Sequence, residues 1–484
     1  MSSGDSEAKV DEPHQDIAAQ EIVAIEARSK ALHKELGVRD LVLTQLLYVV
    51  GAGWVGTAAK LGSSQIVFWL LAALLFYLPQ AAVVTYLSRR LPLEGGLYQW
   101  AKIGFNERVG FFVAWNLWIY TIVLISAFGL SVATTFSYLL GDTGALIAGN
   151  RWYNMVVTAG LIGTMVVTAT YGLRLGKWVH NLGGITQILA FTGLIAVPFI
   201  AAARGKIPAY HPLIFTLPAL SLFTLNIFGK MSMGAFSGFE WVAILAGETR
   251  DPVRSISRSV IIATPIIVFM FIFGTATVVA LIPIDRIDLI SPVAQALQVG
   301  LEGVRGAGLV VPFLVLMILM RLVANTSVLF TGNTRLPMVA GWDGLLPAWF
   351  TRLHARHLTP VNSIRFVGAV TMILALVSLV GVGHQEAYQL LENAAGILYG
   401  LTYLVMFAIP LFGLRNLPGR VPMLLRISAA SGLAVTALYT VLSIFPIIDV
   451  SSWLLFSAKI VGVIVGANII GYGVMLGGRT RANV

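Results

Sequence analysis

Twelve long apolar segments follow one another along the chain, and they restrict its fold more than any other feature. A membrane-spanning helix needs about 20 mostly apolar residues, because each residue adds about 1.5 Å to its length. We therefore predict twelve spanning helices, at residues 41–62, 65–88, 108–140, 153–173, 178–201, 219–248, 257–283, 307–334, 362–383, 388–413, 423–447 and 451–477. The segments are continuously apolar, whereas the strands of a transmembrane barrel alternate. The predicted fold class is an all-α polytopic membrane protein.

The composition agrees with a chain that is solvated mainly by lipid. Of the 484 residues, 57% are hydrophobic and 11% are charged, whereas about 25% of the residues of a soluble domain are charged. So few charges cannot cover a soluble protein of this length, which excludes a cytosolic enzyme, a nucleic-acid-binding protein and a secreted disulfide scaffold. The chain has no cysteine, and its seven histidines show no metal-binding spacing. We therefore expect no metal and no cofactor.

The net charge of +10 is explained by the orientation of the chain in the membrane. With the N-terminus inside, 23 of the 32 Lys and Arg residues fall on the inner side and six fall on the outer side. The positive-inside rule then places both termini in the cytoplasm. We expect a multi-pass protein of the plasma (inner) membrane, with residues 1–37 as a cytoplasmic tail. Nucleic-acid binding has no remaining support.

Glycines interrupt the first and the sixth predicted helices near their middle, in the segments Val50–Gly56 and Gly234–Glu240. Close packing of helices through small residues would explain any one of these glycines. The pair of breaks is more informative, because the sixth helix comes five positions after the first and five is odd. The second set of five helices then enters the membrane from the opposite side, as in an inverted repeat. Paired broken helices in inverted repeats mark the midplane site of a transporter.

The backbone at a helix break is polar and has to face a polar ligand or a cavity. The N-terminus of a half-helix attracts a carboxylate, and freed carbonyl groups attract an ammonium group or a cation. An α-amino acid carries both groups close together, although other zwitterions fit as well. The predicted substrate-binding residues are Gly51, Ala52, Gly53, Phe236, Ser237 and Gly238.

Few ionisable residues lie inside the predicted spans, where a charge costs roughly 2.5–3.5 kcal/mol or more. Glu240 follows the second break, and it is either a proton acceptor coupled to transport or a carboxylate that accepts backbone hydrogen bonds and holds the break open. Lys230 and Arg321 either form a cationic vestibule for anionic or zwitterionic substrates or pair with Glu386 or Glu392. We favour pairing with one of these acids. If the cations are unpaired, an acidic substrate is favoured instead.

The eighth span offers a sodium site as an alternative. The hydroxyl groups of Thr326 and Ser327 would complete an oxygen cage with carbonyl groups of the first break, since sodium is a hard cation. The other interpretation, which we prefer, is that these hydroxyl groups donate to carbonyl groups one turn earlier.

Four short motifs around these spans together resemble the amino acid–polyamine–organocation transporter superfamily. They are Leu36–Leu41 leading to Gly51–Gly53, Pro92–Trp100, Gly238–Glu240 with Gly247–Pro252, and Arg335 with Asp343–Pro347. The resemblance covers nearly the whole chain after the tail. It implies a LeuT-like fold, in which two inverted five-helix repeats, residues 38–202 and 203–414, are followed by two further helices in residues 415–484. It also implies alternating access between the two sides of the membrane.

The resemblance also implies roles for individual residues. The N–H groups of Ala52 and Gly53 would bind the substrate carboxylate, and Phe236 and its neighbours would receive the amino group, with Phe236 as a cover over the substrate. Some members have a sodium-mimicking lysine in helix 5, where this chain has Gln187, which does not titrate. The gating tryptophans of antiporters for basic substrates are replaced by Gly234 and Leu329, which disfavours an arginine-type antiporter.

The sequence therefore predicts a secondary active amino acid transporter, either proton-coupled or working by exchange. The alternatives are a polyamine or organic amine carrier, a sodium-coupled symporter, and a membrane nutrient sensor without transport. A nucleotide-binding loop and a cluster of acidic or histidine residues are both missing from the sequence, so we expect neither an ATP-driven pump nor an enzyme. The expected partners are an amino acid, a proton or counter-substrate, and lipid, and the chain is expected to be a monomer or a homodimer.

Overall fold

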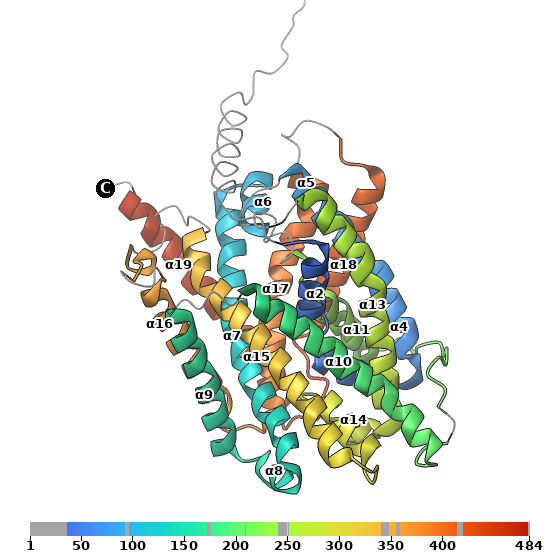
Figure 1. Ribbon diagram of the computed structural model, residues 1–484. Coiled ribbons are helices and arrows are strands. Elements are labelled where there is room, and N and C mark those ends of the chain that lie inside the picture. Colours follow the sequence, from blue (N-terminus) through green and yellow to red (C-terminus); the bar gives the residue numbers. More distant parts are fainter. Residues whose placement is uncertain are drawn as a thin grey trace, which may run out of the picture.

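The computed structural model describes residues 36–482, except for 92–95, 172–175, 209, 241–248, 250, 340–347, 355–358 and 414–419. In this part of the chain the regular structure is helical, with one isolated β-bridge between Leu36 and Thr249. The helices pack into one bundle (Figure 1). The predicted cytoplasmic tail lies almost wholly outside the described residues. The segment Asp343–Pro347 also lies outside them, as do parts of Pro92–Trp100 and Gly247–Pro252.

The described helices include ten continuous helical segments that are long and apolar enough to span a membrane, and α2 with α3 forms an eleventh span with a bend of 48°. The main helices are α2 (Val38–Val49), α3 (Ala52–Ala59), α4 (Gln65–Ala72), α5 (Leu78–Arg90), α6 (Leu97–Gly104), α7 (Glu107–Ser137), α8 (Gly141–Ile147), α9 (Arg151–Thr170), α10 (Gly176–Ala203), α11 (Leu222–Gly229), α13 (Pro252–Leu281), α14 (Pro292–Leu301), α15 (Ala307–Val339), α16 (Val361–Ser378), α17 (His384–Ala408), α18 (Met423–Leu442) and α19 (Trp453–Ala482).

The predicted all-α polytopic fold is confirmed. The ten continuous segments correspond to the predicted spans 2–5 and 7–12, and the bent pair α2–α3 corresponds to the first. The predicted sixth span begins as α11 and continues as a π-helical segment, η4 (Lys230–Ala235), to the second break. Its residues 241–248 lie outside the described part of the chain.

Helix α7 occupies the middle of the bundle, where it packs against α17 and α15. Helix α10 packs in turn against α15 and α2, so the first broken helix is held between these inner helices. Because α7 is enclosed along most of its length, its hydroxyl-bearing residues Ser131 and Thr135 are buried. Buried hydroxyl groups need partners inside the protein, and these two face a cavity beside the helix breaks.

The first break lies at Gly51, between α2 and α3. The N–H of Gly51 donates to the carbonyl of Val49 at 2.9 Å, so it no longer continues the hydrogen-bond ladder of α2, and the backbone of Gly51 is extended. A Cβ atom at Gly51 would lie 2.6 Å from Cδ1 of Trp54. Glycine is therefore required here, because it leaves room for the indole of Trp54 to fold back over the break.

The second break follows a π-helical turn. Helix α11 ends at Gly229, η4 carries the chain to Ala235, and the helical backbone stops after Phe236. Gly238 then adopts φ of 107°, a region that residues with a Cβ atom rarely enter. π-helical segments within spans often occur at functional sites, and this one places the break beside the first.

Candidate functional site

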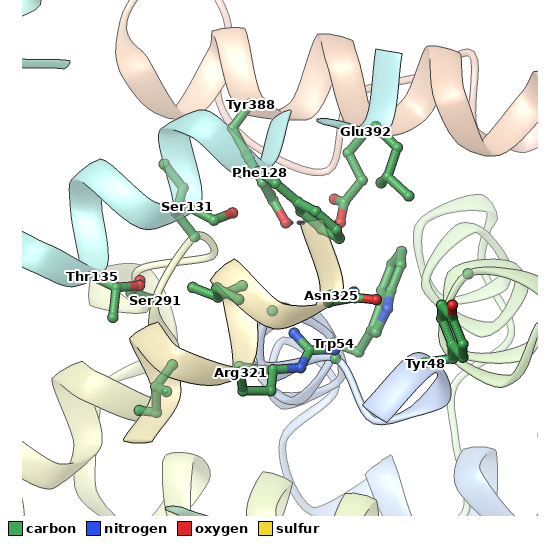
Figure 2. A pocket seen from close by; sticks show the side chains of 18 of the residues that line it. Tyr48, Trp54, Phe128, Ser131, Thr135, Ser291, Arg321, Asn325, Tyr388 and Glu392 are labelled. Carbon is green, nitrogen blue, oxygen red and sulfur yellow. Dashed lines mark hydrogen bonds between the residues drawn. The ribbon is translucent and has the colours of Figure 1, made fainter. Parts of the chain in front are cut away.

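A cavity of about 100 Å³ lies where the two broken helices meet. Ligand sites for drug-sized molecules occupy about 300–1,000 Å³, so this cavity suits a small molecule. Figure 2 shows side chains from several helices directed toward it. The lining residues are Tyr48, Gly51, Ala52, Gly53 and Trp54 of the first break; Tyr120, Leu124, Phe128, Ser131 and Thr135 of α7; Gly234, Ser237 and Gly238; Ile290, Ser291, Val293 and Ala294; Ile318, Arg321, Leu322, Asn325 and Leu329 of α15; and Tyr388, Glu392 and Tyr399 of α17.

The structure brings most of the predicted substrate-binding residues to this cavity. Gly51, Ala52 and Gly53 lie on one side of it, and Ser237 and Gly238 lie at the second break. Ala52 and Gly53 are the first residues of α3, where backbone N–H groups have no acceptor within the helix. The cavity therefore meets a helix N-terminus with its partial positive charge, which favours a carboxylate.

Phe236 is the exception among the predicted binding residues. Its side chain is fully buried and packs against the rings of Trp69, Tyr77 and Phe271, away from the cavity. In this conformation the Phe236 ring does not lie over the cavity, and its role as a cover over the substrate stays a prediction. The ring turns away because the helical backbone continues through residue 236, which points this side chain toward α4 and α13.

Trp54 of the first break occupies the space beside Gly234. A Cβ atom at Gly234 would lie 2.5 Å from Cη2 of Trp54, so the indole fills the volume that a larger residue at position 234 would need. Trp54 of the first broken helix therefore fills the space beside Gly234 in which other members of the superfamily would place a gating tryptophan. Trp54 forms part of the cavity wall (Figure 2).

Two side chains cap the carbonyl groups that the first break sets free. Gln187 of α10 donates from Nε2 to the carbonyl of Val50 at 2.9 Å, and Arg321 of α15 donates from Nη2 to the carbonyl of Leu47 at 3.0 Å. These carbonyl groups lie at the C-terminal end of the half-helix α2, where positive charge is favourable. The side chains of Gln187 and Arg321 therefore bind the carbonyl groups that a bound cation would otherwise contact.

The contacts of Thr326 agree with the preferred interpretation of the eighth span. Its hydroxyl donates to the carbonyl of Leu322, one turn earlier, at 2.7 Å. The sodium site that we considered at Thr326 and Ser327 stays a prediction, and neither residue lines the cavity.

The two buried cations have different surroundings. Lys230 donates a hydrogen bond from Nζ to Oδ1 of Asn393 and lies close enough to Glu392 for an electrostatic interaction. Arg321 contacts no carboxylate among the described residues, and its Nε has no hydrogen-bond partner there. Lys230 thus lies near Glu392 but forms no ion pair with it in the described structure, so its predicted pairing stays a prediction. The predicted pairing is wrong for Arg321, whose guanidinium turns toward the first break instead.

Glu392 and Tyr388 form a polar pair in the cavity wall. The hydroxyl of Tyr388 donates to Oε1 of Glu392 at 3.0 Å, as the dashed line in Figure 2 marks. In that view the pair lies across the cavity from Arg321. Glu386, the other acid that we considered as a partner, is half-buried at the start of α17 and takes part in none of the ion pairs of the described chain.

Glu240 lies directly behind the cavity, fully buried, and two tyrosines of α17 contact its carboxyl group. The hydroxyl groups of Tyr399 and Tyr403 contact its two oxygen atoms. The backbone N–H of Gly238 donates to the hydroxyl of Tyr403 at 3.0 Å. Tyr399 also lines the cavity, so one hydroxyl separates the buried carboxyl group from the space for a ligand.

Sequence reasoning considered Glu392 of α17 only as a partner of Lys230 or Arg321, and it missed the tyrosines of the same helix. Tyr388, Glu392, Tyr399 and Tyr403 are spaced by four, seven and four residues, which places them on one face of a helix. A polar stripe with this spacing inside a spanning helix is a signal that could have identified them.

Comparison with known proteins identifies the family of this chain. A family model described as amino acid permease matches residues 40–465. The chain belongs to the amino acid permease family. The resemblance to the amino acid–polyamine–organocation superfamily is thus confirmed, and the chain is a multi-pass membrane transporter, not an enzyme.

Several relatives match over most of their length. An uncharacterized transporter of Legionella pneumophila is 26% identical over 377 residues, which are 78% of this chain and 80% of that protein. A branched-chain amino acid permease of Bacillus subtilis is 24% identical over 409 residues, 78% of this chain and 84% of the relative. A probable agmatine/putrescine antiporter of Lactococcus lactis is 20% identical over 392 residues, 81% of this chain and 82% of the relative.

Proposed function

We propose that this permease is a secondary active transporter that moves an amino acid across the plasma (inner) membrane by alternating access, coupled to protons or by exchange. The observation that carries the proposal is the meeting of two broken helices at one small cavity. Two inverted repeats, residues 38–202 and 203–414, would rock around this cavity, with both termini in the cytoplasm.

The cavity offers complementary groups for a zwitterion. The N–H groups of Ala52 and Gly53 suit the α-carboxylate, because they begin helix α3. The second break, at Ser237 and Gly238, and the carboxylate of Glu392 are available for the α-ammonium group. The pocket supplies few acidic groups beyond Glu392, and this favours an amino acid over a polyamine.

The hydrogen bonds around Glu240 support a proton-coupled mechanism. One orientation of the Gln80 amide satisfies all its neighbours. In it the amide nitrogen donates to the carbonyl of Phe236 at 2.9 Å. The amide oxygen accepts from the N–H of Phe239 at 3.2 Å and from the hydroxyl of Tyr403 at 2.6 Å. A tyrosine hydroxyl donates one hydrogen bond. Because Tyr403 donates to Gln80, the hydrogen between Tyr403 and Glu240 belongs to the carboxyl group of Glu240. The network is satisfied when Glu240 carries a proton.

The test is transport by the purified protein in vesicles. Wild-type protein should accumulate a labelled amino acid when an inward proton gradient is imposed, without sodium on either side. The Glu240→Gln variant keeps a neutral hydrogen-bonding side chain, so it should still exchange labelled for unlabelled substrate. It should lose accumulation driven by the proton gradient.

Glu302→Gln is the matched control, because Glu302 is an exposed acid that pairs with Lys206 at the surface. It should behave like the wild type. A Glu240→Gln variant that still accumulates substrate in response to the proton gradient would eliminate Glu240 as the proton carrier. Accumulation that requires sodium would favour symport with sodium, and ligand binding without any uptake or exchange would favour a nutrient sensor.

A further inference from the structure

Arg321 is the one buried cation of the cavity wall that has no acidic partner among the described residues. Its side chain is 3% exposed, yet it reaches the cavity from α15. A charge in a low-dielectric site costs several kcal/mol unless it is paired. Lys230, the other buried cation near the site, donates a hydrogen bond to Asn393 and interacts electrostatically with Glu392 without forming an ion pair in the described structure. Arg321 therefore lacks the nearby acidic group that Lys230 has.

The hydrogen-bonding capacity of Arg321 is largely unused. A guanidinium carries five N–H donors in a planar fork, and in the described structure one hydrogen bond, to the carbonyl of Leu47, is formed while Nε has no partner. A carboxylate is the ligand that matches such a fork in both shape and charge. The site is thus complete when the bound molecule supplies a carboxylate to Arg321.

The α-carboxylate of an amino acid already has a receptor at the N-terminus of α3, at Ala52 and Gly53. We propose that Arg321 binds a second carboxylate, so that this permease selects dicarboxylic amino acids of the aspartate and glutamate class. This inference rests on the proposed amino acid transport at the same cavity. The small volume of the cavity suits these compact substrates.

The charges of the site agree with an anionic substrate. Lys230 and Glu392 offset each other, and Arg321 and Glu240 remain. When Glu240 carries a proton, the charge of Arg321 is left uncompensated. A dicarboxylic amino acid with a net charge of −1 restores neutrality, which a site within the membrane requires. One proton on Glu240 and one acidic substrate at Arg321 would then load together.

Binding can be measured without a known transport substrate, by the rise in unfolding temperature as L-aspartate, L-glutamate, L-asparagine or L-glutamine is added to the purified protein. Each acid and its amide have nearly the same shape, so the pair isolates the charge. The wild type should bind each acid at least about 10-fold more tightly than its amide, since a buried unpaired donor set discriminates strongly. Arg321→Gln should weaken binding of the acids at least about 10-fold and leave the amides within about threefold.

Arg305→Gln removes an exposed arginine by the same substitution and should leave all four affinities unchanged. Equal affinity of the wild type for acids and amides would overturn the proposal while amino acid transport stands. So would an Arg321→Gln variant that loses all four ligands equally, because Arg321 would then bind the α-carboxylate or only cap α2. If Arg321→Gln does not fold, Arg321→Lys keeps the charge without the fork, and the wild-type comparison still decides. Failure of every amino acid to bind and to be transported would instead refute the proposed function.

Discussion

Gly238 provides the sharpest test of the second break. Its φ of 107° is unfavourable for any residue with a Cβ atom, and holding such a residue in a sparsely populated region costs about 1–3 kcal/mol. Gly238→Ala should therefore reduce the population of the broken conformation by about 5- to 150-fold relative to competing ones. The N–H of Gly238 also donates to Tyr403 at 3.0 Å, so the change reaches the contacts of Glu240.

The assay is a ligand titration followed by thermal unfolding, with substrate exchange in vesicles as a second measurement. If the broken conformation binds substrate, the apparent dissociation constant rises as the fraction of protein in that conformation falls, by up to the same 5- to 150-fold. Gly163→Ala is the matched control, since Gly163 lies in α9 with open space around a Cβ atom. It should leave binding unchanged. A folded Gly238→Ala protein that binds and exchanges substrate like the wild type would refute the role of this break.

Two further predictions concern α15 and the contact between α7 and α19. Thr326→Val should leave uptake sodium-independent and close to the wild-type rate, because the Thr326 hydroxyl donates to the carbonyl of Leu322. A large loss of uptake that added sodium restores would contradict this. Asn116 and Asn468 donate to each other at 2.8 and 3.2 Å, and a double-mutant cycle with leucine on thermal stability should give a coupling of about 0.6–2 kcal/mol, whereas additive losses would show that the pair contributes nothing specific.

The spans could be predicted from the sequence because each is a local property of about 20 residues. The breaks were also visible, since Gly51 and Gly238 stand where a straight helix disfavours them. The direction of a side chain next to a break could not be predicted, because it depends on where the last helical residue lies. Phe236 is still helical and therefore points into the core.

Pairing between charges from different helices is equally hidden in the sequence. Lys230 and Arg321 both lie inside predicted spans with the same candidate acids, yet only Lys230 lies near Glu392. The difference arises because Arg321 reaches the freed carbonyl of Leu47, and the position of that carbonyl depends on the bend between α2 and α3. Short-range patterns cannot supply this geometry.

If the cavity between the two broken helices is the substrate site, a bound substrate should protect a cysteine placed in its wall from a thiol reagent. The chain has no cysteine, so Ser237→Cys introduces a single thiol into the cavity wall, and Ser63→Cys introduces one at an exposed position as a control. A transported amino acid should slow the reaction of a small thiol reagent at position 237 in proportion to its occupancy of the transporter and leave position 63 unaffected. Equal labelling of position 237 with and without saturating substrate, in a variant that still transports, would show that the substrate does not bind in this cavity.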